Sequence, residues 1–215
     1  MKQLFRLCMV ITIFTLVACA EEQHKQLSPE MQSVHWLNQA HEYSTTGQHD
    51  KAIPLYEKVL NEEILRSGSN NPKVSVYWNN LGMVWEDKGQ FDKAIEYYKK
   101  AIDSALESLG PSHSQVAVYW NNLGKSWKKK GRLDKAIEYF EKALNSDINN
   151  YGPLDSTVSN RWSALGEAWF QKKNYSQARY YFERALVVRR AIFGENHPST
   201  VAAREWLDKT IKHLE

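Results

Sequence analysis

The chain repeats itself every 42 residues without a gap. Three columns of the repeat hold aromatic or small residues: Trp36, Trp78, Trp120 and Trp162; Ala40, Gly82, Gly124 and Gly166; Tyr43, Trp85, Trp127 and Trp169. Two further columns keep the same register: Ala52, Ala94, Ala136 and Ala178; Tyr56, Tyr98, Phe140 and Phe182. Such a period is typical of a solenoid, in which each unit buries its apolar face only against its neighbours. The sequence therefore predicts four stacked units, at residues 35–76, 77–118, 119–160 and 161–202.

Within one unit the spacing of apolar residues indicates two helices. The first helix has an apolar face whose members recur at i, i+3, i+4 and i+7: Trp78, Leu81, Gly82 and Trp85. The second helix has a stripe of small, large and small residues: Ala94, Tyr98 and Ala101. The column that holds Gly82 and Gly124 predicts a close approach of the two helices beneath the indoles.

Turn residues mark where the helices begin and end. We expect Gly89 to end the first helix and Asp92 to cap the second, with Gly131 and Asp134 in the same roles one unit later. Pro72 and Pro198 favour helix starts, where a missing N–H group costs nothing.

These columns match a known motif. The pattern Trp78-x₂-Leu81-Gly82-x₂-Trp85, followed by Ala94-x₃-Tyr98, resembles the tetratricopeptide repeat (TPR). The 42-residue period, the Trp-Asn-Asn-Leu-Gly block and the loop Gly194–Pro198 resemble the repeats of kinesin light chains and their bacterial relatives. The resemblance implies an all-α, right-handed superhelical solenoid with a concave groove. This domain would span residues 30–215, with four helix pairs and a C-terminal capping helix at 203–215.

The N-terminus has the layout of an export signal. Lys2 and Arg6 precede an almost wholly apolar stretch, Leu7 to Ala18, which predicts a signal peptide at residues 1–18. The segment Leu16-Val17-Ala18-Cys19 resembles the bacterial lipobox, which implies that Cys19 carries lipid. Ala20 then implies sorting to the outer membrane, with residues 19–29 as a lipidated cysteine and polar tether. The alternative is an ordinary signal peptide with a chance cysteine at position 19.

Composition and motifs favour no catalytic or cofactor chemistry. A net charge of +3 with both signs interspersed favours neither nucleic acid nor a polybasic membrane surface. The cysteines, Cys8 and Cys19, both lie near the N-terminus, so the rest of the chain has neither a disulfide nor a cysteine metal site. His113 and His197 occupy equivalent loops and are interpreted as helix-start residues. No motif of a hydrolase, a phosphate-binding loop or a zinc protease occurs. The sequence therefore predicts no enzyme, no cofactor and no metal site.

The groove is the predicted binding surface. Its candidate residues lie off the packing face of the first helices: Asn79, Met83, Glu86, Asn121, Lys125, Lys128, Lys129, Glu167 and Phe170. The resemblance to kinesin light chains implies that Asn79 and Asn121 hold a peptide backbone; alternatively, they tie adjacent helices together. Glu86 and Asp87 occupy the positions that Lys128 and Lys129 hold one unit later. This reversal predicts a basic middle of the groove, or else charges that pair across the repeat junction.

These features together predict a lipid-anchored periplasmic scaffold that binds envelope proteins or peptides in its groove. The alternatives are a self-associating structural protein of the envelope, or an adaptor of a cell-wall enzyme or of a secretion or pilus machine. The carboxylate clamp of chaperone-binding TPR domains is absent, because the position of its lysine holds Asn79 and Asn121. The oligomeric state and the identity of the partner stay open.

Overall fold

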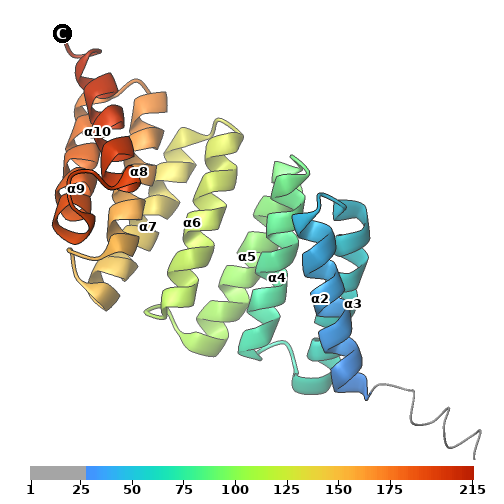
Figure 1. Cartoon of the computed structure of the whole chain (residues 1–215). Coiled ribbons are helices and arrows are strands. Elements are labelled where there is room, and N and C mark those ends of the chain that lie inside the picture. The colour runs from blue at the N-terminus through green and yellow to red at the C-terminus, as the bar shows by residue number, and fades with distance from the viewer. Residues whose placement is uncertain (1–27) are drawn as a thin grey trace, which may run out of the picture.

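The computed structural model describes residues 28–215, and within this range nine α-helices account for nearly all of the chain (Figure 1). The predicted signal peptide, Cys19 and most of the tether lie outside the described residues. The helices are α2 (Pro29–Thr45), α3 (His49–Ser67), α4 (Pro72–Asp87), α5 (Phe91–Leu109), α6 (Ser114–Lys129), α7 (Leu133–Tyr151), α8 (Ser156–Gln171), α9 (Tyr175–Phe193) and α10 (Pro198–Ile211).

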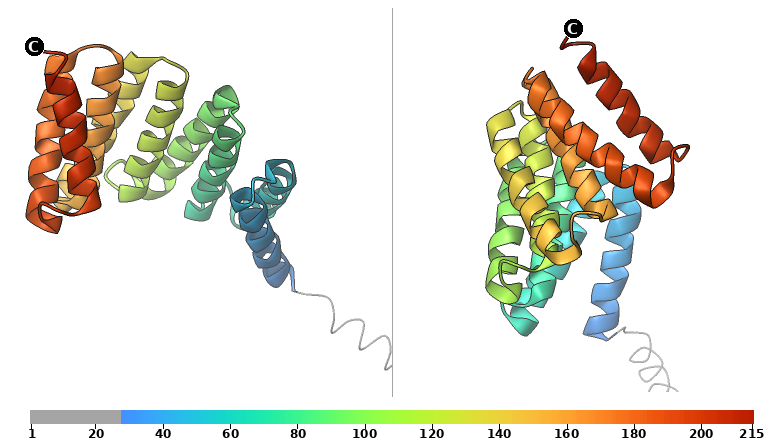
Figure 2. Two further views of the ribbon diagram at one scale, coloured as in Figure 1. Left: turned by 45° about the horizontal axis from the view of Figure 1, so that its top comes forward. Right: turned by 90° about the vertical axis from the view of Figure 1, so that its left-hand side faces the viewer.

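The helices pack in consecutive pairs. The closest packing joins α2 with α3, α4 with α5, α6 with α7 and α8 with α9, and each pair then contacts the next through its second helix. We call α2, α4, α6 and α8 the inner helices and α3, α5, α7 and α9 the outer helices. The stack is curved, with its two ends toward one side and its middle toward the other (Figure 2, right). The predicted all-α solenoid of four helix pairs and a capping helix is confirmed.

Each pair begins before the predicted unit boundary. The inner helices begin at Pro72, Ser114 and Ser156, which keeps the 42-residue period but starts each unit earlier than the aromatic columns suggested. For the same reason the capping helix starts at Pro198 instead of residue 203 and packs on α9 as a fifth inner helix.

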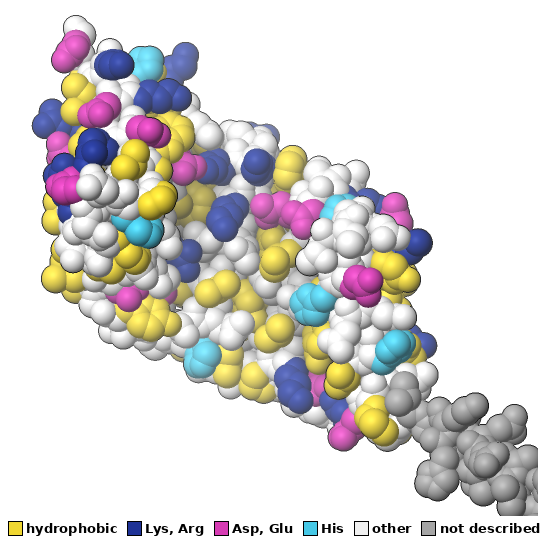
Figure 3. All heavy atoms as spheres, viewed as in Figure 1, with side chains coloured by type: hydrophobic (Ala, Val, Ile, Leu, Met, Phe, Trp, Pro, Cys, Tyr) yellow, Lys and Arg dark blue, Asp and Glu magenta, His cyan; other side chains and the backbone are white. Residues whose placement is uncertain are grey.

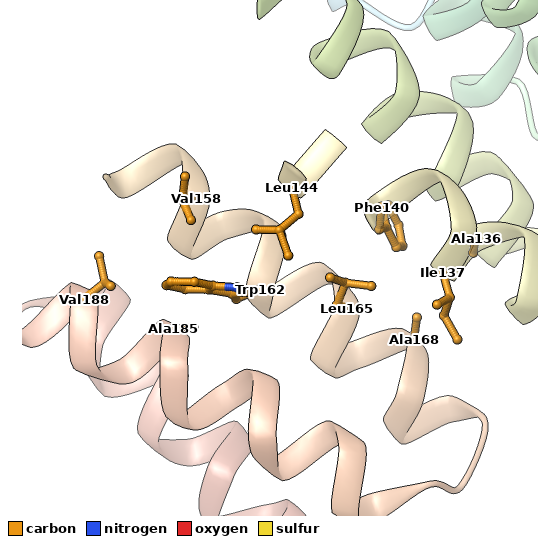
Figure 4. Close-up of a cluster of buried hydrophobic side chains, with 10 residues drawn as sticks. All are labelled: Ala136, Ile137, Phe140, Leu144, Val158, Trp162, Leu165, Ala168, Ala185 and Val188. Atoms are coloured by element: carbon orange, nitrogen blue, oxygen red, sulfur yellow. The ribbon is translucent and has the colours of Figure 1, made fainter. Parts of the chain in front are cut away.

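The predicted apolar faces form the core. In one junction, Phe140 and Leu144 of α7 pack with Trp162 and Leu165 of α8, and Val188 of α9 closes the cluster (Figure 4). All five side chains are buried. Because every such cluster draws on consecutive helices, no pair can bury its apolar surface alone, and the energy of burial links neighbouring units.

The glycine column allows the close approach of paired helices. A Cβ atom added at Gly124 would lie 2.6 Å from Cε1 of Phe140, and one added at Gly82 would lie 2.6 Å from the ring of Tyr98. The predicted packing role is confirmed, but the neighbour differs from the expectation. The group over each glycine is the aromatic ring of the outer helix, not the indoles of the inner helix.

Side chains cap the inner helices as the loop residues predicted. The Nδ1 atoms of His113 and His197 accept hydrogen bonds from backbone N–H groups two residues later, at 3.2 Å in each case. Pro72 and Pro198 occupy the first turns of α4 and α10. The helix-start interpretation of both histidines is therefore confirmed.

The expected caps of the outer helices are wrong. Helix α5 begins at Phe91, with Gln90 at the cap position, so Asp92 falls inside the first turn. Gly89 has a positive φ of 73°, and the turn closes through the Gln90 N–H group on the Trp85 carbonyl at 2.9 Å, so the helix restarts earlier than expected. A carboxylate in the first turn still favours the helix, because it faces the positive end of the helix dipole.

These first-turn aspartates form a series of ion pairs between successive units. Each aspartate contacts a lysine just after the next inner helix, in the pairs Asp50–Lys88, Asp92–Lys130 and Asp134–Lys172. The aspartates are largely exposed, so solvent screens these pairs and each contributes little to stability. Their regular recurrence keeps the junctions between the four pairs alike.

Candidate functional site

The inner helices line a hollowed face of the molecule. Figure 3 shows this face, where acidic and basic side chains lie close together near its middle. The predicted groove residues all belong to α4, α6 and α8, and the structure gives them three kinds of environment. Some are used within the fold, some are paired across a junction, and some are exposed.

The two asparagines are buried within the fold. Asn79 and Asn121 are only 7% and 5% exposed. The Asn79 Oδ1 atom accepts a hydrogen bond from Asn122 Nδ2 at 3.0 Å, which joins α4 to α6. The Asn79 Nδ2 group lies 3.4 Å from the Met83 sulfur. The geometry at Asn79 therefore supports the tie between adjacent helices over a grip on a peptide.

Glu86 is also engaged by neighbouring helices. Its Oε2 atom accepts hydrogen bonds from the Ser126 hydroxyl at 2.7 Å and from the Tyr98 hydroxyl at 3.1 Å. The carboxylate thus connects α4, α5 and α6. Burial, with a smaller contribution from the charge of Glu86, raises the pKa of Tyr98 well above its usual range. Tyr98 therefore stays a neutral donor to Glu86.

The predicted cluster of lysines divides into one paired and two exposed members. Lys128 Nζ lies 2.5 Å from Glu167 Oε2 of the next inner helix. Lys125 and Lys129 are exposed, and neither makes an ion pair with another residue of the range 28–215. For Lys128, pairing across the junction is therefore what the structure shows.

The electrostatic setting of Lys125 reflects these neighbours. Loss of surrounding water lowers the pKa of Lys125, and the positive charges of Arg161 and Lys128 add to this effect. The carboxylates of Glu86 and Glu167 offset part of it. Lys125 is therefore at the centre of the mixed charges on the concave face, where an additional carboxylate from a ligand would favour its charged form.

Phe170 does not line an open groove. Its ring packs edge-on against Tyr175, Trp206 and His213, at centroid distances of 5.3, 5.5 and 5.4 Å. Trp206 and His213 come from the C-terminal end of the chain, so this end contacts the Phe170 ring and takes up part of the surface that a ligand could reach. Phe170 is half-buried where the capping helix α10 packs, and its role in binding stays a prediction.

The structure contains an ion pair beside this site that was not predicted from the sequence. Arg161 Nε of α8 lies 2.7 Å from Asp147 Oδ2 of α7, with side chains only 10% and 1% exposed. Burial raises the pKa of Asp147, and the Arg161 guanidinium lowers it by less, so the net direction is upward. A signal was present in the columns, because two residues of opposite charge stand on either side of the junction between the third and fourth units. One unit earlier the equivalent positions hold Ala105 and Tyr119.

Two further properties bear on function. Across residues 28–215, no group of three or more histidine, cysteine, aspartate or glutamate side chains is placed to hold a metal ion. In the same part of the chain, no helix combines the length and apolar character that a membrane span requires.

The sequence matches profiles of a known repeat family. Three family profiles, each described as a tetratricopeptide repeat, match residues 36–62, 73–149 and 163–199. Together they cover more than half of the chain. The chain is a tetratricopeptide-repeat protein. TPR domains are typically non-catalytic and generally bind proteins or peptides, and this TPR protein is an interaction scaffold in that general sense.

Several solved structures share the fold. The crystal structure of BtubC (BKLC) from P. vanneervenii has a TM-score of 0.74 and 24% identity, over 81% of this TPR protein and 70% of that chain. A putative kinesin light chain of Podosopora anserina with nearly identical TPR-like repeats has a TM-score of 0.74 and 17% identity, over 84% and 85% of the two chains. A variant of that protein reaches 0.76, with 16% identity over 88% and 89%. No curated protein sequence matches significantly.

Proposed function

We propose that this TPR protein binds an acidic segment of a partner protein on its concave face. The observation that carries the proposal is a contrast between columns. The packing columns repeat with little change, whereas two concave columns change in every unit: His41, Met83, Lys125 and Glu167; Thr45, Asp87, Lys129 and Gln171. Packing does not require this variation, so it is available for ligand selection.

The chemistry of the third unit favours an acidic ligand. Lys125 and Lys129 are exposed, and Met83 of the preceding inner helix is 46% exposed and offers an apolar contact. Glu86 and Glu167 are already engaged by Ser126 and Lys128. An incoming carboxylate would therefore meet two cations whose charges are not fully matched, and electrostatic complementarity of this kind mainly raises the rate of association.

The second unit supplies a matched test, because it holds Met83 and Asp87 where the third unit holds Lys125 and Lys129. We expect the double variant Lys125→Met, Lys129→Asp to bind its partner about tenfold more weakly at low salt, mainly through slower association. Neither substitution breaks an ion pair within the described residues, so folding should be preserved. The measurement is association rate against salt concentration, with a partner captured by crosslinking in intact cells.

The control is Lys99→Glu on the outer helix α5, an exposed lysine that makes no ion pair within residues 28–215. It changes the net charge in the same direction but leaves the concave face intact. If the control slows association as much as the double variant does, the effect belongs to net charge, and the proposed binding face is incorrect.

We also propose that the TPR domain is held at a bacterial membrane, facing the periplasm, by lipid on Cys19. The lipobox-like Leu16–Cys19 segment supports this proposal, and Ala20 favours the outer membrane. The nine residues from Ala20 to Ser28 would span at most about 30 Å when extended, enough to hold the concave face close to the membrane surface.

Cys8 provides the matched control for the anchor. We expect metabolic labelling with a fatty acid to mark the wild-type protein and Cys8→Ala equally, because the predicted signal peptide contains Cys8 and is removed. Cys19→Ala should lose the label completely and leave the membrane fraction. Equal labelling of wild type and Cys19→Ala would exclude the anchor while leaving the binding proposal intact.

A further inference from the structure

A second surface, which shares no residue with the predicted concave groove, is apolar and open. It is a hollow of about 440 Å³ between the loop after α7 and the outer helix α9. Trp162 and Val188 are buried and form its floor. Its walls are four apolar residues: Pro153, Leu154, Tyr180 and Val187. We call these six residues the outer patch.

The equivalent hollow one unit earlier shows that the outer patch is not required by the fold. That hollow has a volume of about 270 Å³ and keeps the proline and the tryptophan, as Pro111 and Trp120. Its other walls are polar, because Ser112 and Asn145 stand where the outer patch has Leu154 and Val187. The third position changes in the same sense, from Glu138 to Tyr180.

The apolar side chains of the outer patch are strongly exposed. Leu154 is 66% exposed, Val187 is 59% exposed and Tyr180 is 46% exposed. Three polar-to-apolar changes in one place leave apolar surface that the rest of residues 28–215 does not cover. Contiguous apolar surface on a folded protein is typical of a contact site.

The rim of the patch carries charges of both signs. Glu183 and Arg184 are neighbours in α9, and both line the hollow. The Arg184 guanidinium lies 4.5 Å from the centroid of the Tyr180 ring, and Glu183 accepts a hydrogen bond from Arg179 at 2.7 Å. In a two-fold interface, residue i of one copy meets residue j of the other, and the reverse contact also forms. Glu183 of each copy would then face Arg184 of its counterpart.

The shape of the patch is self-complementary in the same way. Leu154 lines the hollow but leaves most of its side chain exposed, and the hollow is large enough to accept an aliphatic side chain. In a two-fold dimer, the exposed leucine of each copy can enter the apolar hollow of the other, so the same contact forms twice.

We propose that the outer patch binds a second copy of this TPR protein in a two-fold arrangement. The concave faces of both copies then stay accessible. The outer patch and its rim comprise eight residues, fewer than the roughly 20–30 that each partner contributes to a standard interface, so association is weak and depends on concentration. This proposal does not rest on the proposed ligand of the concave face.

The first test places a photo-crosslinker at the patch in the full-length chain. Two copies with different tags are produced together, both carrying Tyr180→p-benzoylphenylalanine. We expect a crosslinked species that contains both tags, and no such species from the matched probe Glu138→p-benzoylphenylalanine one unit earlier. The variant Leu154→Ser, Val187→Asn, which copies the preceding unit, should reduce the crosslinked fraction about tenfold, because two exposed apolar contacts are lost.

The second test uses the charges. Glu183→Arg alone and Arg184→Glu alone should each reduce crosslinking about tenfold, because like charges then face each other across the axis. The double exchange Glu183→Arg, Arg184→Glu should restore it, since both contacts are rebuilt with opposite polarity. A crosslink to a different protein, the absence of any crosslink, or a double exchange that fails to restore it in a chain with unchanged helical content would each overturn the proposal.

Discussion

Replacing Arg161 with alanine should lower the free energy of unfolding by about 3–5 kcal/mol, because it leaves the Asp147 carboxylate buried without its charge partner. Asp147 is 1% exposed and its Oδ2 atom lies 2.7 Å from Arg161 Nε. The preceding junction offers a matched rescue, since Ala105 and Tyr119 fill the two equivalent positions there. The double variant Asp147→Ala, Arg161→Tyr should therefore recover most of the lost stability. Chemical denaturation followed by circular dichroism measures both variants.

The loss should also depend on pH in a defined direction. Burial raises the pKa of Asp147 above its usual 3.8, and removing Arg161 raises it further. A raised carboxyl pKa favours the folded state below the unfolded pKa, and this contribution is lost as the pH rises through the folded pKa. The destabilisation by Arg161→Ala should thus be largest at neutral pH and shrink as the pH falls toward the unfolded pKa of about 4. A loss that is constant across this range would show that Asp147 is not buried as a charge.

Gly124→Leu should destabilise the protein by about 1–3 kcal/mol, even though leucine favours helices more than glycine does. A Cβ atom at this position would lie 2.6 Å from Cε1 of Phe140 and 3.2 Å from the Ala136 carbonyl oxygen, so α6 and α7 must separate. Phe140 is fully buried and cannot turn away. Thermal unfolding measures the effect, and Lys125→Leu on the exposed side of the same helix is the control. If the two leucine variants melted at the same temperature, the close packing of α6 on α7 would be disproved.

The features that could be predicted from the sequence are those fixed within one unit. The aromatic and small columns predict the helix pairing, because a recurring glycine such as Gly124 inside a helix indicates that a partner helix packs closely against it. The role of His113 was predictable for a similar reason, since a loop residue that recurs just before an inner helix can cap that helix through its own side chain. Each of these interactions is complete within a short stretch of chain.

The features that could not be predicted depend on contacts between units or at the end of the stack. The sequence left two roles open for Asn79, and what favours the tie between helices is a hydrogen bond from Asn122 of the next unit. Phe170 has the position of a groove residue, but its ring packs against Trp206 of the capping helix. The period alone does not fix where a helix begins, so the expected cap at Asp92 lies after the true cap residue, Gln90.

The bonds from Glu86 to Ser126 and from Lys128 to Glu167 have a mechanical consequence. Both join successive inner helices, so they oppose straightening of the curved stack. The stack can therefore straighten only when these two interactions break. A ligand that competes for Lys128 or Glu86 should therefore lengthen the molecule as it binds, whereas one held by Lys125 and Lys129 should leave its length unchanged. Small-angle scattering would distinguish a stiff clamp from a spring that yields to its ligand.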